Sequence, residues 1–299
     1  MQAWLDWLVT GAGAVLLLLT LRDIFHTLWH PSAGGSLSQV VIRGIWRAGR
    51  RRRRRGHPRA VTGPVALLAV VVTWLSLVIL GGALLYAPHL PEGFVYGPGV
   101  EPAEDGGFVD GLYLSAVTVS TLGFGDIVPG ETWMRLVVPV QSLIGFALLT
   151  AAVGWIVLVY PALSRRRALA ARLSLTRRTV PEGLLSEPDS VLGAVVLERL
   201  ASELVQVRID LAQYAETYYF RDGPDRSALP VVIGIAVDLA AQGQKSPRAD
   251  VRLAARMLDE AIDDFATLLD DQFLRVRGSR AEILAAYADA HDHRPEDPV

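Results

Sequence analysis

The chain has 299 residues, of which 51% are hydrophobic and 20% are charged, and its formal net charge at pH 7 is −2. Its mean hydropathy of +0.33 is well above that of an ordinary soluble domain. Cysteine is absent, which excludes disulfides. No Ser–His–Asp, Walker or metal-protease pattern occurs, so the sequence gives no support to an enzyme.

The first hydrophobic segment, residues 3–21, is apolar apart from Asp6 and predicts a transmembrane helix in an N-terminal unit at 1–30. A signal peptide is the alternative, but it requires a basic amino end, and no Lys or Arg precedes this segment. Because the positive charges follow the segment, we expect its amino terminus to lie outside.

Three polar residues of this unit, Asp23, His26 and His30, fall on one helical face at spacings of three and four. The favoured interpretation is an interfacial helix with polar residues at headgroup level. A metal site or a pH sensor stays open as the alternative, although two histidines and one carboxylate are no recognisable ligand set on their own.

Residues 31–61 predict an arginine-rich cytoplasmic loop, with nine arginines between positions 43 and 59. Six consecutive arginines just inside a membrane indicate a patch for anionic lipids, with a plain topology signal as the alternative. Nucleic acid is the usual rival partner, and a membrane-tethered position disfavours it. The patch consists of Arg50, Arg51, Arg52, Arg53, Arg54 and Arg55.

Two longer stretches, residues 60–88 and 136–164, contain no charge and are each 29 residues long, whereas a membrane span needs about 20. The apolar stretch at 110–120 is too short to cross, and we interpret it as a re-entrant pore helix. The carboxyl end of such a helix carries partial negative charge, which favours a cation in the cavity below it.

The pore helix is followed by Thr121-Leu122-Gly123-Phe124-Gly125-Asp126. A dehydrated cation must be met by backbone carbonyls in place of its water, so consecutive residues must aim C=O groups at one axis. Glycine accepts the left-handed conformations that this requires. The motif predicts a selectivity filter whose ion-binding residues are Thr121, Leu122, Gly123, Phe124 and Gly125.

This motif, between two uncharged spans, resembles the signature filter of potassium channels, and residues 62–162 resemble a bacterial potassium channel of the two-helix pore-loop superfamily. The resemblance implies K⁺ at the filter carbonyls and the Thr121 hydroxyl as the inner ring. Leu122 stands where valine or isoleucine is usual, and Phe124 replaces the commoner tyrosine. Phe124 therefore lacks the phenolic hydrogen bond that would brace the filter. Val117 stands where many relatives carry a carboxylate.

Charge placement predicts the orientation of this pore. No Lys or Arg lies between Arg59 and Arg135, whereas seven acidic residues do, among them Asp126 at the outer mouth. Arginines flank both spans on the other side, which places the filter loop outside and the remaining chain in the cytoplasm. The acidic mouth would concentrate cations; a solvated acidic loop is the alternative.

Two features of the last span bear on gating. The resemblance puts a hinge at Gly145, with close helix packing as the equally weighted alternative. Apolar residues at the inner end predict a constriction that closes by dewetting, formed by Val157, Val159 and Tyr160. Coupling to the rest of the chain is expected to run through Arg165–Arg167 or the neighbouring arginine patch.

Beyond the pore domain, 62–163, the pattern changes to that of a soluble helical domain. Apolar residues recur every three or four positions, which predicts helices at 190–220, 227–242, 248–276 and 279–291. Residues 164–189 are expected to be a linker, 190–291 a cytoplasmic helical domain of unknown ligand, and 292–299 a disordered tail.

The sequence thus predicts an all-α membrane protein with three transmembrane helices, a re-entrant pore helix and filter, and an all-α cytoplasmic C-terminal domain. One filter segment per chain cannot surround an ion, so we expect a homotetramer in a bacterial inner membrane, with K⁺ as permeant ion and no cofactor. The alternatives are a non-conducting membrane sensor or scaffold, and a transporter, which would require four pore units in one chain.

Overall fold

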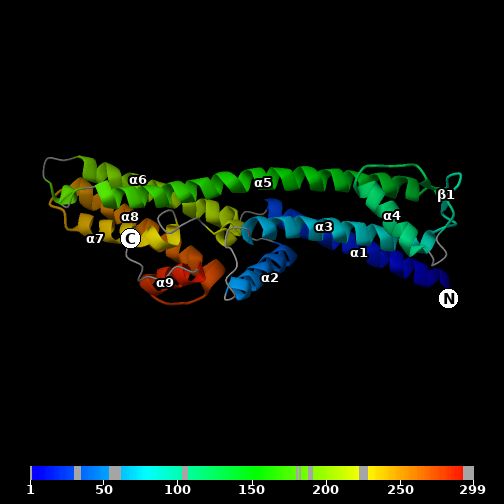
Figure 1. Ribbon diagram of the computed structural model, residues 1–299, viewed down its shortest axis with the longest axis horizontal. Coiled ribbons are helices and arrows are strands. Elements are labelled where there is room, and N and C mark those ends of the chain that lie inside the picture. Colours follow the sequence, from blue (N-terminus) through cyan, green and yellow to red (C-terminus); the bar gives the residue numbers. More distant parts are fainter. Residues whose placement is uncertain are drawn as a thin grey trace. The chain divides into compact units, whose positions relative to one another are not determined.

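The computed structural model describes residues 2–29, 35–53, 62–102, 107–179, 181, 183–187, 191–221 and 228–291 (Figure 1). The chain divides into two compact units. The first comprises Met1–Ala48 and Val65–Val157, and the second comprises Gly49–Pro64 and Leu158–Val299. Among the described residues, three helices are long and apolar enough to cross a membrane: Trp4–Leu28, Gly63–His89 and Met134–Thr179. The predicted all-α membrane fold is confirmed.

The first unit is built from α1 (Gln2–Trp29), α2 (Ser36–Arg53), α3 (Thr62–Tyr86) and α4 (Phe108–Val119) with the first part of α5 (Met134–Thr179). A short antiparallel pair of strands, β1 (Phe94–Tyr96) and β2 (Ile127–Pro129), flanks the loop that follows α4. Their register pairs Val95 with Val128. A buried cluster that includes Tyr86, Leu114 and Met134 ties α3, α4 and the start of α5 together.

Helix α1 packs closely on α3. A Cβ at Gly13 would lie 2.6 Å from the carbonyl oxygen of Gly81, so the backbones touch where both residues are glycine. Near its amino end, Trp7 contacts the rings of His89 and Trp133, at centroid distances of 5.2 and 5.9 Å. Helix α1 is therefore in contact with the segment that follows α3 and with the segment that precedes α5.

Residues 31–61 were expected to be a loop, and this expectation is wrong for 36–53, which form α2. Ser38, Ile42 and Trp46 are buried at intervals of four residues, so the segment is amphipathic and presents one face to the unit. The structure describes neither the side chains of residues 50–53 nor Arg54 and Arg55, so the arginine patch stays a prediction. His30 also lies outside the described residues.

The second unit is a helical bundle formed by the end of α5, α6 (Leu192–Gln213), α7 (Leu229–Gln244), α8 (Ala249–Leu269) and α9 (Arg280–Ala290). The 3₁₀ helices η2 (Leu184–Ser186) and η3 (Ala215–Tyr219) and a π-helical turn, η5 (Asp270–Leu274), complete it. Figure 1 shows α6, α7 and α8 gathered along the end of α5. Helices α6, α7, α8 and α9 correspond to the four predicted helices, although α6 and α8 end seven residues earlier than predicted. The tail at 292–299 lies outside the described residues.

The expected linker at 164–189 needs correction. Helix α5 continues without interruption to Thr179, and Leu169 and Leu173 are buried in the core of the second unit. The arginines at 165–167 end the hydrophobic stretch, but they do not end the helix, because arginine is a good helix former.

Candidate functional site

The loop after α4 carries the predicted filter. Two hydrogen bonds of 3.0 Å extend the end of α4: Thr121 N donates to Thr118 O, and Leu122 N donates to Val117 O. From Thr121 to Gly125 the backbone is left-handed at every second residue. The turn therefore leaves α4 in a fixed direction.

The φ angle is 59° at Thr121, 55° at Gly123 and 77° at Gly125. Alternation of left-handed residues with residues of negative φ turns successive peptide groups to the same side, as a carbonyl-lined filter requires. A Cβ at Gly123 or Gly125 would meet nothing within 4 Å, so glycine serves conformation here and not space. Thr121 has a branched Cβ, and its positive φ is a strained state that costs about 1–3 kcal/mol.

The filter segment is open on the single chain. Residues 121–125 are all exposed, and the side chains of Leu122 and Phe124 retain 60% and 65% of their accessible surface. Two apolar side chains in such a position need a cover that one chain does not supply.

Asp126 does not simply face solvent. The hydroxyl of Tyr113 on α4 donates to Asp126 Oδ2 over 2.5 Å, and Ile127 N donates to Oδ1 over 3.1 Å. Gly97 N, beside β1, donates to the backbone carbonyl of Asp126 over 2.7 Å. Phe124 has no hydroxyl with which to brace the predicted filter, whereas Tyr113, which no sequence motif singles out, holds Asp126 at its end. A tyrosine on the predicted pore helix was the only available signal.

A second phenol fastens the other end of α4. Tyr96 in β1 donates to Asp110 Oδ2 over 2.7 Å. Burial, together with the hydrogen bond and the negative charge of Asp110, raises the pKa of the Tyr96 phenol above its ordinary value.

A buried polar network joins α3, α4 and α5, and no sequence pattern predicts it. Tyr86 of α3 donates to Gln141 Oε1 over 2.6 Å, and Gln141 Nε2 of α5 donates to Ser115 Oγ over 2.7 Å. The Ser115 hydroxyl donates to Ile79 O over 2.7 Å. Gly82 makes room, since a Cβ there would lie 2.0 Å from Gln141 Nε2. The network fixes the position of α4, and with it the start of the predicted filter.

The candidate hinge, Gly145, lies against the end of α4. A Cβ at this position would stand 2.1 Å from the carbonyl oxygen of Val119. The glycine therefore permits a close helix contact, which favours the packing alternative, and α5 runs through the position as a helix. The hinge role stays a prediction.

The three candidate constriction residues do not share a surface. Val157 and Tyr160 are 62% and 50% exposed, whereas Val159 is fully buried. Val159 points away from Val157, because residues two apart on a helix point to nearly opposite sides, and the constriction stays a prediction. Val157 and Tyr160 continue an exposed apolar stripe along α5 that consists of Leu136, Val140, Leu143, Phe146, Leu149 and Val153.

Asp23 is buried and accepts hydrogen bonds from α2 and α3. It is 7% exposed, and its carboxylate accepts hydrogen bonds from Leu37 N, Ser38 Oγ and Trp74 Nε1. The part of the chain that the structure describes holds no group of three His, Cys, Asp or Glu residues suited to a metal ion.

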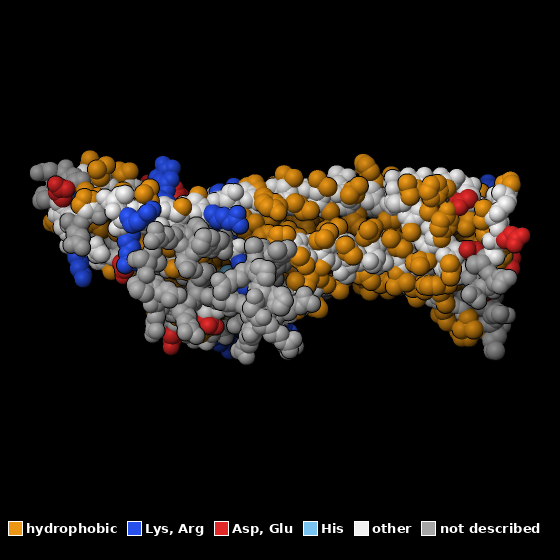
Figure 2. Space-filling view, in the orientation of Figure 1, with side chains coloured by type: hydrophobic (Ala, Val, Ile, Leu, Met, Phe, Trp, Pro, Cys, Tyr) orange, Lys and Arg blue, Asp and Glu red, His pale blue; other side chains and the backbone are white. Residues whose placement is uncertain are grey.

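Figure 2 shows hydrophobic side chains over the visible face of the first unit and acidic side chains at the end that carries β1.

Comparison with known proteins agrees with this geometry. Residues 72–160, from the middle of α3 to Tyr160 in α5, match the ion channel family model. Human potassium channel subfamily K member 5 is 29% identical over 161 residues, which are 52% of this chain and 30% of the human protein. The match to the ion channel family indicates a transport protein and not an enzyme, as the sequence predicts.

Two bacterial relatives match as well. The Bacillus subtilis membrane protein YdjJ, named as uncharacterized, is 28% identical over 162 residues, or 53% of this chain and 46% of YdjJ. A Rhodopseudomonas palustris protein whose name proposes a potassium channel is 30% identical over 147 residues, or 48% of this chain and 34% of the relative. The chain spans less than half the length of each relative, and no solved structure matches. Residues 72–160 thus match the ion channel family, and the chain is a membrane protein that is similar to potassium channels over about half of its length.

Proposed function

We propose that the chain conducts potassium ions in single file through a filter formed by four copies of residues 121–125. The observation that carries the proposal is the left-handed backbone at Thr121, Gly123 and Gly125, in a segment that is exposed on one chain. Carbonyls aimed to one side coordinate an ion only when several chains surround it. Exposed Leu122 and Phe124 would be covered by assembly into a homotetramer.

The proposed location is a bacterial inner membrane. The amino terminus and the filter loop would lie outside, and residues 165–299 would lie in the cytoplasm. The absence of Lys and Arg between Arg59 and Arg135 supports this orientation. A cysteine placed at Gln2 of this cysteine-free chain should react with an impermeant reagent from outside. Reaction from the cytoplasmic side alone would reverse the orientation.

The second unit would act on the pore through α5 itself. Arg165 on α5 makes two hydrogen bonds to the Asp210 carboxylate of α6, at 2.6 and 2.8 Å. Arg166 donates to the backbone carbonyls of Thr217 and Phe220, at 2.7 and 2.9 Å. These contacts support the expectation that coupling runs through Arg165–Arg167, and a continuous helix transmits position better than a flexible linker.

Rubidium uptake into liposomes that contain the purified chain tests the proposal. Gly123→Ala adds a Cβ where φ is positive and should abolish uptake or its preference for potassium over sodium. Gly99→Ala is the matched control, because Gly99 has a φ of 82° with nothing within 4 Å of its Cβ but lies outside the filter. An assembled parent protein that passes no rubidium would favour the sensor or scaffold alternative.

A further inference from the structure

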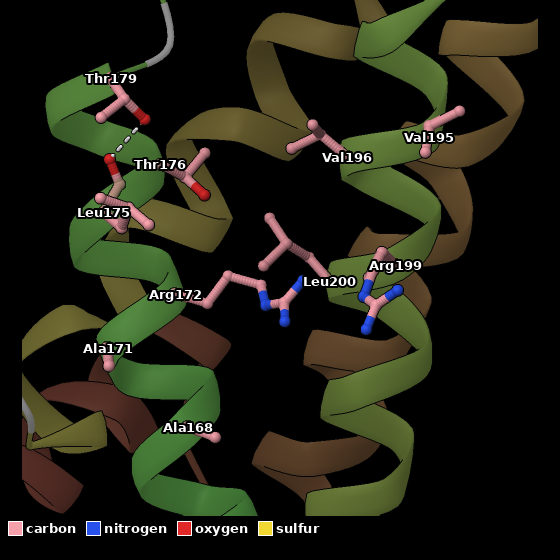
Figure 3. A pocket seen from close by; sticks show the side chains of 10 residues that line it. All are labelled: Ala168, Ala171, Arg172, Leu175, Thr176, Thr179, Val195, Val196, Arg199 and Leu200. Atoms are coloured by element: carbon pink, nitrogen blue, oxygen red, sulfur yellow. Dashed lines mark hydrogen bonds between the residues drawn. The ribbon is translucent and has the colours of Figure 1, made fainter.

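A pocket of about 560 Å³ opens between the end of α5 and the first turns of α6 in the second unit (Figure 3). Ligand pockets usually span about 300–1,000 Å³. The space exists because Ala168 and Ala171 on the α5 wall are small. Leu175 on α5 with Val195 and Leu200 on α6 provide apolar lining.

The pocket has an excess of positive charge. Arg172 from α5 and Arg199 from α6 line it, and both contact the carboxylate of Glu203, at 3.1 and 3.2 Å. Two guanidinium groups share one carboxylate, so one positive charge stays without compensation by Glu203. Both arginine side chains are accessible, at 42% and 61% exposed, and guanidinium groups suit carboxylates and phosphates.

The rim of the pocket is apolar and exposed. Leu175 is 52% exposed and Val195 is 58% exposed. A ligand that neutralised the arginines and also covered these side chains would need an anionic head and a hydrocarbon chain.

Sequence position also favours an amphiphile. Ala168 follows Ser164, the last residue of the uncharged stretch, by four residues, which is a rise of about 6 Å along a helix. We propose that this pocket binds an anionic amphiphile whose carboxylate or phosphate pairs with Arg172 and Arg199 and whose chain lies along Leu175 and Val195. The source is either a free fatty acid or an anionic lipid of the bilayer.

The test measures binding to the full-length protein in neutral detergent, with radiolabelled oleate as the fatty-acid probe. Oleate should bind saturably, and oleyl alcohol, which has the same chain without the charge, at least tenfold more weakly. Arg172→Gln with Arg199→Gln, and separately Ala171→Phe, which fills the pocket, should each weaken oleate binding at least tenfold. Arg177→Gln, on α5 outside the pocket, should change the affinity less than twofold.

A second arm identifies the source by mass spectrometry of phosphatidylglycerol retained from neutral nanodiscs doped with that lipid. Retention that the double variant loses indicates a bilayer lipid, and oleate binding without such retention indicates a free fatty acid. If oleate does not bind saturably and phosphatidylglycerol is not retained, the proposal is overturned. Equal binding of oleate and oleyl alcohol by the parent also overturns it, a result that does not depend on how the variants fold. Neither binding assay measures rubidium uptake, so the outcome for this pocket does not depend on whether the chain conducts potassium.

Discussion

The indole Nε1 of Trp74 on α3 donates a hydrogen bond of 3.0 Å to Oδ2 of Asp23 on α1. The same carboxylate accepts from the backbone N–H groups of Leu37 and Ser38 at the start of α2. Trp74 in turn contacts the ring of Trp155 on α5, with centroids 5.7 Å apart. One buried carboxylate therefore caps α2 and orders a chain of contacts from α1 to α5.

This arrangement predicts that Asp23 stabilises the first unit. Asp23→Ala removes the acceptor of several buried donors, and leaving such donors unsatisfied should cost about 3 kcal/mol. The thermal midpoint of the detergent-solubilised protein should fall by several degrees, whereas Asp6→Ala on the same helix should change it little. If zinc stabilised the parent and not Asp23→Ala, the metal-site interpretation would regain support over the structural one.

The Tyr113–Asp126 hydrogen bond predicts a role in filter stability. Tyr113→Phe removes a bond to a charged group, worth about 1.5–3 kcal/mol, and should lower the preference for rubidium over sodium in the liposome assay. Tyr96→Phe is the contrast, because it removes the hydrogen bond from Tyr96 to Asp110 at the far end of α4 and leaves the Tyr113–Asp126 hydrogen bond in place. Equal selectivity in the parent and Tyr113→Phe would remove Tyr113 from the filter support.

Local sequence patterns predict much of this architecture, whereas contacts between residues far apart in the sequence have no such pattern. Uncharged stretches and helical periodicity are local signals, and they predict the three spans and the four helices of the second unit. Glycine spacing is a local signal too, and it predicts the left-handed backbone at Gly123 and Gly125. The brace and the buried network involve partners far apart in sequence, such as Tyr86 and Gln141, which no local pattern connects. The arginines after Ser164 predict the end of the membrane span, but charge does not predict the end of a helix, so the extension of α5 to Thr179 has no local signal.

Glu216 in η3 predicts a pH dependence of the second unit. The residue is 7% exposed, and burial raises the pKa of its carboxyl from 4.5 to about 7. The folded state thus binds a proton that the unfolded state releases above pH 4.5, so stability is highest at low pH. It declines as the pH rises from about 4.5 to 7, and above that range Glu216 adds no further slope.

Amide hydrogen exchange of α6 and α8 in the full-length protein, corrected for the intrinsic pH effect, measures this decline. The opening free energy should fall by about 3 kcal/mol or less over the window, at about 1.4 kcal/mol per pKa unit. Glu216→Gln should flatten the dependence, while Glu198→Gln, at an exposed position of α6, should keep it. A parent profile that rises with pH would contradict the buried neutral carboxyl.

Gly145 and Gly154 lie on the same helix and differ in one measurable respect. A Cβ at Gly145 would stand 2.1 Å from Val119 O, whereas one at Gly154 would meet nothing within 4 Å. Gly145→Ala should therefore push α5 away from the end of α4, destabilise the assembly and reduce rubidium uptake. Gly154→Ala should be neutral or slightly stabilising, since alanine has the higher helix propensity by about 1 kcal/mol.

Thermal stability of the solubilised assembly separates packing from hinge bending at Gly145. If the glycine serves the contact with Val119, the thermal midpoint and uptake should fall together in Gly145→Ala. If it serves as a hinge, uptake should fall while the midpoint stays at or above that of the parent, because alanine stiffens a helix without breaking a contact. The steric overlap with Val119 O predicts the first outcome, and an unchanged midpoint with lost uptake would establish the hinge instead.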